Sequence, residues 1–134
     1  MDHLYISDMY IAQDYNLMID NKITHVLIAS KNIFPPYLGH FSYLVLPIED
    51  HPSFNIIPMI EIANNFIEKA VQSGNVLVHC MAGMSRSASI VIGYLIYKGM
   101  TFSEAYKLMK IKHSITYPNA GFEDQLLNYA KAKK

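Results

Sequence analysis

Hydrophobic residues along this chain occur in two patterns that alternate from one end to the other. The first pattern is a short run of apolar, often β-branched residues, which is typical of a buried strand. The second is a longer segment whose apolar residues recur every three or four positions, as they do on one face of a helix. The short runs predict strands at residues 4–6, 24–29, 43–48 and 75–79.

Helices are predicted in the longer segments between and after these strands. Residues 55–72 have the most regular spacing, and the apolar residues that share one face of this segment are Ile56, Ile60, Ala63, Ile67 and Ala70. A capping box at Thr101 and Glu104 begins a helix that extends to about residue 113. The remaining helices are expected at residues 11–21, at residues 87–99 before a cap at Gly99, and from residue 119 or 121 toward the C-terminus.

The alternation of strands and helices favours an α/β fold, in which helices cover a sheet. We expect a central, mostly parallel sheet of four to five strands flanked by helices on both faces. The strand at 24–29 is apolar enough to lie in the centre of that sheet. A chain of 134 residues has the length of one domain, so residues 1–134 are predicted to form a single unit without repeats or linkers.

The composition indicates which partners and which cellular compartment to expect. The 11 basic and 11 acidic residues balance, whereas a nucleic-acid-binding domain normally has a basic face, so no nucleic-acid partner is expected. No apolar stretch approaches the length of a membrane span and the first residues lack a signal-peptide core, so no membrane association is expected. A lone cysteine fits a reducing compartment, which predicts a cytoplasmic protein, with the nucleus as a second location. The oligomeric state stays open, with a monomer as the simplest expectation.

Candidate chemistry centres on the only cysteine and the only arginine of the sequence. Cys80 and Arg86 stand six residues apart, and every other fixed positive charge is a lysine. Lysine is a point charge on a flexible stem, whereas the planar guanidinium of arginine binds phosphate oxygens through two parallel hydrogen bonds. Because the chain has arginine at position 86 alone, we predict that the planar guanidinium is needed at this position.

The residues around this pair predict an anion-binding loop. A predicted strand at 75–79 precedes the loop, and residues 87–99 are apolar almost all round, as in a buried helix. In such a unit the loop amides and the helix N-terminus bind anions, and Gly83 can adopt a positive φ. A thiol in this position ionises more readily than a free thiol. We therefore expect Cys80 to attack phosphorus as a thiolate, forming a phosphocysteine intermediate, while Arg86 binds the phosphate oxygens.

Two simpler interpretations of Cys80 are less consistent with its surroundings. A lone cysteine after a core strand is often an inert small hydrophobe, but the spacing to Arg86 and the glycine between them argue against that role. A metal site is weaker still, because there is no second cysteine and the other histidines are scattered without ligand spacing. The expected chemistry needs no metal and no cofactor.

Hydrolysis of a phosphate ester also needs a group that protonates the leaving oxygen and then activates water, and one carboxyl can do both in turn. The polar residues Glu49, Asp50 and His51 follow the predicted strand at 43–48. If that strand runs parallel to 75–79, they emerge at the same edge of the sheet as Cys80. Spacing alone does not choose among the three, and a turn that happens to be polar is an equally good interpretation.

The sequence resembles the cysteine-dependent protein phosphatases. Their signature is matched by His79-Cys80, five further residues and Arg86-Ser87, and the string HCMAGMSRSAS resembles the dual-specificity subgroup. Further similarity lies in residues 23–27, which resemble the second strand of the family, in residues 46–50, which resemble the strand and loop of its general acid, and in residues 117–122, which resemble its Pro-Asn-x-x-Phe segment. The resemblance extends over nearly the whole chain and implies a phosphatase-like fold.

This resemblance also implies roles by position. Cys80 corresponds to the nucleophile, Arg86 to the phosphate clamp and Asp50 to the general acid and base, while the hydroxyl of Ser87 would assist departure of the thiolate. The other residues of the loop would bind the substrate phosphate together with Arg86: Met81, Ala82, Gly83, Met84 and Ser85. Two supporting residues are implied as well: His79 behind the thiol, and Asn119 as a brace for the loop, for which a simple helix N-cap is an equally good interpretation.

The implied substrates are phosphorylated proteins. A compact chain resembles the dual-specificity enzymes, whose shallow pocket accepts phosphoserine and phosphothreonine as well as phosphotyrosine. Lipid phosphatases and RNA 5′-triphosphatases on the same scaffold tend to carry basic loop residues, whereas the variable loop positions here are uncharged. A phosphoprotein-binding module is the alternative from another class, although such inactive relatives usually lack the cysteine or the arginine.

Overall fold

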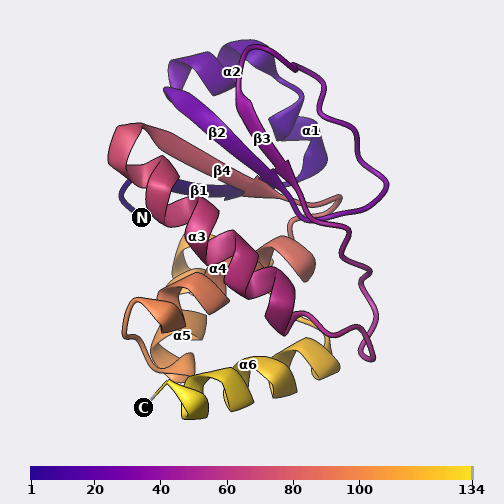
Figure 1. Ribbon diagram of the computed structural model, residues 1–134, viewed down its shortest axis with the longest axis vertical. Coiled ribbons are helices and arrows are strands. Elements are labelled where there is room, and N and C mark those ends of the chain that lie inside the picture. Colours follow the sequence, from indigo (N-terminus) through magenta and orange to yellow (C-terminus); the bar gives the residue numbers. More distant parts are fainter. Residues whose placement is uncertain (134) are drawn as a thin grey trace.

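The computed structural model describes residues 1–133, so the last residue of the predicted domain, Lys134, lies outside the described part. The described residues form one sheet with helices on both of its faces (Figure 1). The strands are β1 (Leu4–Ser7), β2 (Ile23–Ile28), β3 (Ser42–Val45) and β4 (Asn75–His79). The helices are α1 (Met9–Ala12), α2 (Tyr15–Asp20), α3 (Ile57–Ser73), α4 (Arg86–Tyr97), α5 (Phe102–Lys112) and α6 (Ala120–Ala132).

Within residues 1–133 the sheet has four strands in the order β1-β4-β2-β3, and every neighbouring pair is parallel. The register places Leu77 of β4 between Tyr5 of β1 and Val26 of β2. The carboxyl ends of the strands therefore meet at one edge of the sheet, as the arrowheads in Figure 1 show. The predicted α/β fold with a mostly parallel central sheet is confirmed.

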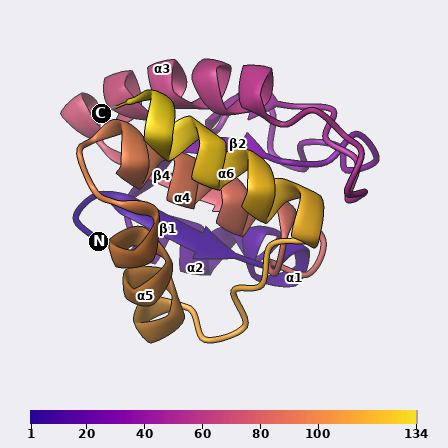
Figure 2. The same ribbon diagram turned by 90° about the horizontal axis from the view of Figure 1, so that it is seen from below.

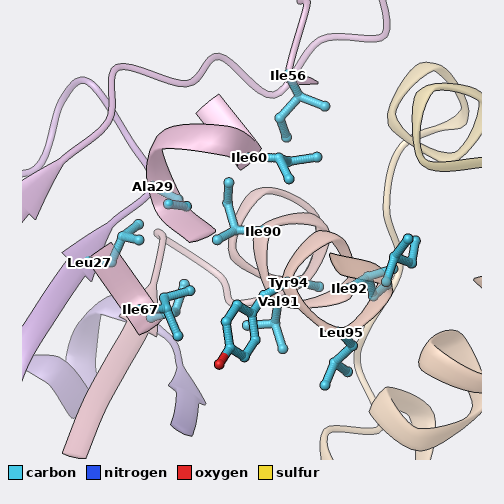
Figure 3. Packing of buried hydrophobic residues seen from close by; sticks show 14 of the residues in the cluster. Leu27, Ala29, Ile56, Ile60, Ile67, Ile90, Val91, Ile92, Tyr94 and Leu95 are labelled. Atoms are coloured by element: carbon cyan, nitrogen blue, oxygen red, sulfur yellow. The ribbon is translucent and has the colours of Figure 1, made fainter. Parts of the chain in front are cut away.

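The two faces of the sheet are covered unequally. The short helices α1 and α2 lie on one face, where Met18 and Val26 belong to a small apolar cluster. The other face is covered by α3 and α4, and α4 contacts the sheet on one side and α5 and α6 on the other (Figure 2). Ile60 of α3, Ile90 of α4 and Leu27 of β2 belong to the larger cluster, part of which Figure 3 shows. The thicker layer thus contains most of the core and the helix that follows the predicted loop.

The helix α4 is the most enclosed element of the molecule. Its residues 87–96 are all buried, as the apolar sequence predicts. It ends at Tyr97, and Gly99 then takes a φ of +112°. The amides of Gly99 and Met100 donate to the carbonyls of Ile96 and Leu95 (3.0 and 3.1 Å), which confirms the predicted glycine cap.

Among residues 1–133, no helix combines the length and the apolar character needed to cross a membrane.

Two predicted elements differ from the structure by more than one or two residues at an end. The helix predicted at 11–21 is wrong, because the structure has two short helices there. The side chains of Asp8 and Asp14 accept from the amides of Ile11 and Leu17, so each aspartate caps the start of its own helix. The strand predicted at 43–48 ends at Val45; shortly after it stands Pro47, which has no N–H with which to continue the ladder.

Candidate active site

The predicted anion-binding loop joins the end of β4 to the start of α4. Cys80 follows β4 directly and is 2% exposed, so its sulfur lies at the base of the loop and not on its rim. The strand end is held by the amide of Ala29, which donates to the carbonyl of His79 (2.8 Å). Because β4 is an inner strand packed under α4, the position of the sulfur is determined by the core.

Two polar groups approach the sulfur of Cys80. The backbone N–H of Gly83 donates to Sγ at 3.3 Å, and the hydroxyl of Ser87 lies 3.2 Å from Sγ. Ser87 is in the first turn of α4 and is fully buried. Since the amides at a helix N-terminus also carry partial positive charge, an oxyanion bound beside the sulfur would be stabilised here.

The loop carbonyls are held by donors from outside the loop. The amide of Met9 donates to the carbonyl of Met81 (3.1 Å), and the amide of Tyr117 donates to that of Met84 (2.8 Å). In a trans peptide the C=O points opposite to the N–H of the next residue. Holding these carbonyls outward therefore turns the amides of Ala82 and Ser85 toward the interior of the loop, where an oxyanion would need donors.

Arg86 is half-buried and lies where three strands end. Its Nη1 donates to the hydroxyl of Ser30 (3.1 Å) and to the carbonyl of Ile48 (3.3 Å). Ser30 follows β2 and is 1% exposed, while Ile48 follows β3. The guanidinium is thus held at the sheet edge where β4 delivers Cys80, and it does not extend into solvent.

Asp50 is linked to the loop through Asn119. The Nδ2 of Asn119 donates to Oδ1 of Asp50 (2.9 Å), and its backbone N–H donates to Oγ of Ser85 in the loop (3.0 Å). The Oδ1 of Asn119 also accepts from the amide of Phe122 (2.8 Å), which caps α6. Asn119 therefore caps α6 and binds Asp50 through its side chain, and it binds the loop through its backbone N–H.

The other two candidates beside Asp50 have different partners. Glu49 forms an ion pair with Lys31, and that hydrogen bond and charge lower the pKa of the Glu49 carboxyl. The ring of His51 accepts a hydrogen bond at Nδ1 from the amide of Ser53 (3.1 Å). Of the three neighbours that spacing alone could not separate, Asp50 is the one that the described contacts connect to the loop.

His79 lies under the loop and is 1% exposed. Burial lowers the pKa of its imidazole, so the ring is held neutral. Its Nδ1 is 3.4 Å from the carbonyl of Cys80, and Nε2 has no hydrogen-bond partner among residues 1–133. The polar contact of His79 given by the described residues is therefore with the backbone of Cys80.

Two residues at the site were not found by sequence reasoning. Ser30, which binds Arg86, follows a buried strand. Its position just after the carboxyl end of that strand is a sequence feature from which it could have been predicted. His113 is the residue after α5, and its Nε2 is 2.6 Å from the carbonyl of Gly83. Nothing in the local sequence indicates that contact, because it joins residues 30 positions apart.

Comparison with protein families agrees with this geometry. The model of the dual specificity phosphatase catalytic domain matches residues 4–132. Dual specificity protein phosphatase 1B of Arabidopsis thaliana is 38% identical over 131 residues, which are 96% of this chain and 78% of that protein. MAP kinase phosphatase with leucine-rich repeats protein 1 of Dictyostelium discoideum is 36% identical over 98% of this chain, which spans only 16% of that longer protein.

Solved structures with the same fold include human proteins. The crystal structure of human DUSP28 superposes with a TM-score of 0.94 at 25% identity, covering 98% of this chain and 94% of that one. Human tyrosine phosphatase-like serine/threonine/tyrosine-interacting protein gives a TM-score of 0.92 at 33% identity, covering 98% and 93%. The chain therefore belongs to the dual specificity phosphatase family. It carries the family's catalytic domain, which hydrolyses phosphate monoesters on proteins.

Proposed function

We propose that this domain dephosphorylates proteins through a covalent intermediate on Cys80. In the first step the Cys80 thiolate attacks phosphorus, forming an S–P bond while the bond from phosphorus to the side-chain oxygen of the substrate breaks. That oxygen takes a proton from the carboxyl of Asp50, so it leaves as a neutral hydroxyl. Arg86 and the loop amides bind the non-bridging oxygens, whose charge they balance in the transition state.

The second step releases inorganic phosphate. The Asp50 carboxylate takes a proton from water, the water oxygen forms a bond to phosphorus, and the S–P bond breaks. Sulfur then leaves as a thiolate, which the Ser87 hydroxyl stabilises by donating a hydrogen bond over the 3.2 Å separation. The reaction is balanced without a redox partner and needs no further reactant besides water.

One observation carries this proposal. The sulfur of Cys80 lies between the Gly83 amide and the Ser87 hydroxyl at the N-terminus of α4, and the only arginine of the sequence is held at the same sheet edge. An inert core cysteine would have apolar neighbours on all sides. The link from Asp50 through Asn119 to Ser85 supports the choice of general acid.

The test is turnover of an aryl phosphate by the wild-type domain and by Cys80→Ser. The hydroxyl of serine is a far weaker nucleophile than a thiolate, so we expect activity to fall to the background rate. Thermal melting checks that the variant is folded, and trapping of the phosphoenzyme at Cys80 by rapid acid quench and mass spectrometry tests the intermediate. Full activity of Cys80→Ser would exclude the proposed nucleophile.

Phosphotyrosine, phosphoserine and phosphothreonine side chains are the proposed substrates. The variable loop residues Met81, Ala82, Met84 and Ser85 carry no charge, so the loop has no lysine with which to bind a second phosphate. Relatives named as MAP kinase phosphatases support a phosphoprotein substrate. Values of kcat/KM on matched phosphotyrosine, phosphothreonine and phosphoserine peptides, with an inositol phosphate as comparison, test this proposal. A higher kcat/KM on the inositol phosphate would contradict it.

A phosphoprotein-binding module is the second candidate function. It is favoured by one comparison, since a solved relative at 33% identity is named as a phosphatase-like interacting protein. The two candidates differ in a single measurement. A wild-type domain that binds phosphopeptides without releasing phosphate supports the binding module, whereas release of phosphate that Cys80→Ser abolishes supports the enzyme.

A further inference from the structure

The carbonyl of Gly83 has a side-chain partner from a distant element. The Nε2 of His113 lies 2.6 Å from this oxygen, closer than the amides of Met9 and Tyr117 lie to the carbonyls of Met81 (3.1 Å) and Met84 (2.8 Å). A carbonyl can only accept, so Nε2 carries the proton and donates it. Both the neutral Nε2–H tautomer and the imidazolium have the N–H that this bond needs.

The backbone of His113 is itself firmly held. Its amide donates to the carbonyl of Met109 at the end of α5 (2.7 Å). Its own carbonyl accepts from both the amide and the hydroxyl of Thr116 (3.0 and 2.7 Å), and Thr116 is fully buried. The imidazole therefore projects from a fixed point, which lowers the entropic cost of placing Nε2 on the loop.

Gly83 is confined on its other side by the end of β1. Its φ is +73°, and a Cβ at this position would come within 2.9 Å of the carbonyl oxygen of Ser7. A glycine is required there both for the backbone angle and for the close approach. The peptide of Gly83 is thus held between β1 on one side and His113 on the other.

We propose that His113 is a positioning residue for catalysis by Cys80, acting through Gly83. The contact controls two amides at once. It orients the peptide that joins Gly83 to Met84, which turns the Met84 N–H toward the interior of the loop. It also holds Gly83 in place, so that the Gly83 N–H remains directed at Sγ of Cys80 (3.3 Å). His113 itself touches neither sulfur nor substrate, and this inference rests on the proposed function for the identity of the nucleophile.

The test compares two substitutions of His113 with a matched control. His113→Phe keeps a ring of similar size and removes the donor, whereas His113→Gln keeps an N–H at similar reach. His40→Phe is the control, because His40 is exposed and packs against Tyr15. For an aryl phosphate we expect kcat/KM to fall roughly 2- to 10-fold in His113→Phe, the range of one hydrogen bond, and to recover in His113→Gln.

A second readout does not depend on turnover. The rate of Cys80 alkylation by iodoacetamide, followed against pH by mass spectrometry, reports how readily the thiol ionises. We expect its midpoint to move to higher pH in His113→Phe and to stay near the wild-type value in His113→Gln and His40→Phe. This shift would support the positioning role even if the domain released no phosphate, so failure of the proposed function is distinguished from failure of this inference.

Two results would overturn the inference. One is an alkylation midpoint in His113→Phe equal to that of the wild type, because the Gly83 amide would then not depend on His113. The other is a fall in kcat/KM that His113→Gln does not restore, which would indicate a role for the imidazole ring other than hydrogen-bond donation. Thermal melting of each variant separates either result from simple loss of folding.

Discussion

Glu49 and Asp50 are neighbours in the sequence, yet their carboxylates have different partners in the fold. Glu49 pairs with Lys31, whereas Asp50 accepts a hydrogen bond from Asn119, which also binds Ser85 of the loop. The sequence places both carboxyls at the same strand end, and their contacts distinguish them. The two residues therefore offer a matched pair of substitutions for testing the general acid.

We expect Asp50→Asn to slow hydrolysis strongly and Glu49→Gln to have little effect. The loss should be largest for a phosphoserine peptide, whose alkoxide leaving group needs a proton, and smaller for an aryl phosphate with a good leaving group. A general acid contributes about 10²–10⁴-fold, so kcat on the peptide should fall at least 100-fold or so. If Glu49→Gln shows the larger loss, Asp50 is not the acid.

The buried imidazole of His79 predicts a pH dependence of stability. Burial lowers its pKa in the folded state, while in the unfolded chain it titrates near 6.5. As the pH falls below about 6.5, the unfolded chain takes up a proton that the folded one refuses, so the free energy of unfolding decreases. Replacing His79 with asparagine removes this contribution.

Thermal melting at about pH 7.5 and about pH 5.5 tests this expectation. The wild-type Tm should fall more on acidification than the Tm of His79→Asn, whose other titrating groups are unchanged. An equal fall in both proteins would show that His79 is not responsible. A lower Tm for the variant at both pH values would not affect the comparison, since only the difference between the two pH values is used.

Sequence proximity determined which site residues could be predicted. Cys80, Gly83 and Arg86 lie within one short loop, so their spacing alone indicates an anion site. Ser30 stands 56 residues before Arg86, which it contacts. His113 stands 30 residues after Gly83, which it contacts. No local pattern records such contacts, because they arise from the packing of separate strands and helices.

The backbone of α6 lies so close to the segment after Asp50 that only a glycine fits at the point of contact. A Cβ on Gly121, in the first turn of α6, would lie 1.9 Å from the carbonyl oxygen of Pro52. This contact is with backbone, which cannot move aside as a flexible side chain can. The glycine therefore lets the N-terminus of α6, and with it the Asn119 cap, dock against the segment that carries Asp50.

Gly121→Ala is expected to separate these two elements. Alanine has the higher intrinsic helix propensity, by about 1 kcal/mol, yet overpacking typically costs about 1–3 kcal/mol, so we expect a lower Tm. Activity on a phosphoserine peptide should fall more than activity on an aryl phosphate, because Asp50 is displaced. Asn128→Ala, an exposed change in the same helix, is the control, and equal behaviour of the two variants would contradict the close-approach argument.

Boundaries of helices and strands were predictable where a local signal exists. The capping box at Thr101 and Glu104 is present with both hydrogen bonds, and Gly99 ends α4 as expected. The division of residues 9–20 into two helices was missed, because the caps at Asp8 and Asp14 compete with an apolar pattern that is compatible with one longer helix. Here the aspartate side chains decide the local structure.

The molecule as a whole gathers its chemistry at one edge because all neighbouring strands are parallel. The alternation of apolar runs and amphipathic segments was sufficient to predict this arrangement. The strand order β1-β4-β2-β3 was not predicted, since similar apolar runs are interchangeable in a sequence pattern. That order places the Cys80 strand inside the sheet, next to β2. Ser30, which follows β2, and Ile48, which follows β3, then both contact Arg86.

Binding of an oxyanion should stabilise the whole domain. A ligand at about 100 times its Kd adds about 2.7 kcal/mol to the free energy of unfolding, which corresponds to several degrees in Tm. We expect inorganic tungstate to raise the Tm of the wild type and to raise that of Arg86→Lys much less, because lysine keeps the charge but loses the planar fork. An identical shift in both proteins would place the anion elsewhere.

The single cysteine limits how the domain responds to oxidation. Mild peroxide should convert Cys80 to sulfenic acid or, after loss of water, to a cyclic sulfenamide, since the 134 residues offer no second thiol for an internal disulfide. Intact mass distinguishes these products, and a thiol reductant should restore activity. Oxidation confined to methionines, with Cys80 still alkylatable, would contradict the expected reactivity.

The segment from His113 to Asn119 has a consequence for how substitutions combine. It contacts the loop through the side chain of His113 and through the backbone amides of Tyr117 and Asn119. The side chain of Asn119 also binds Asp50. Changes at positions 113 and 119 would both act on one shared loop, so their energetic effects should not sum. Whether a substitution at position 113 is tolerated should therefore depend on the residue at position 119, and the reverse. Evolution and engineering would have to change the two positions together.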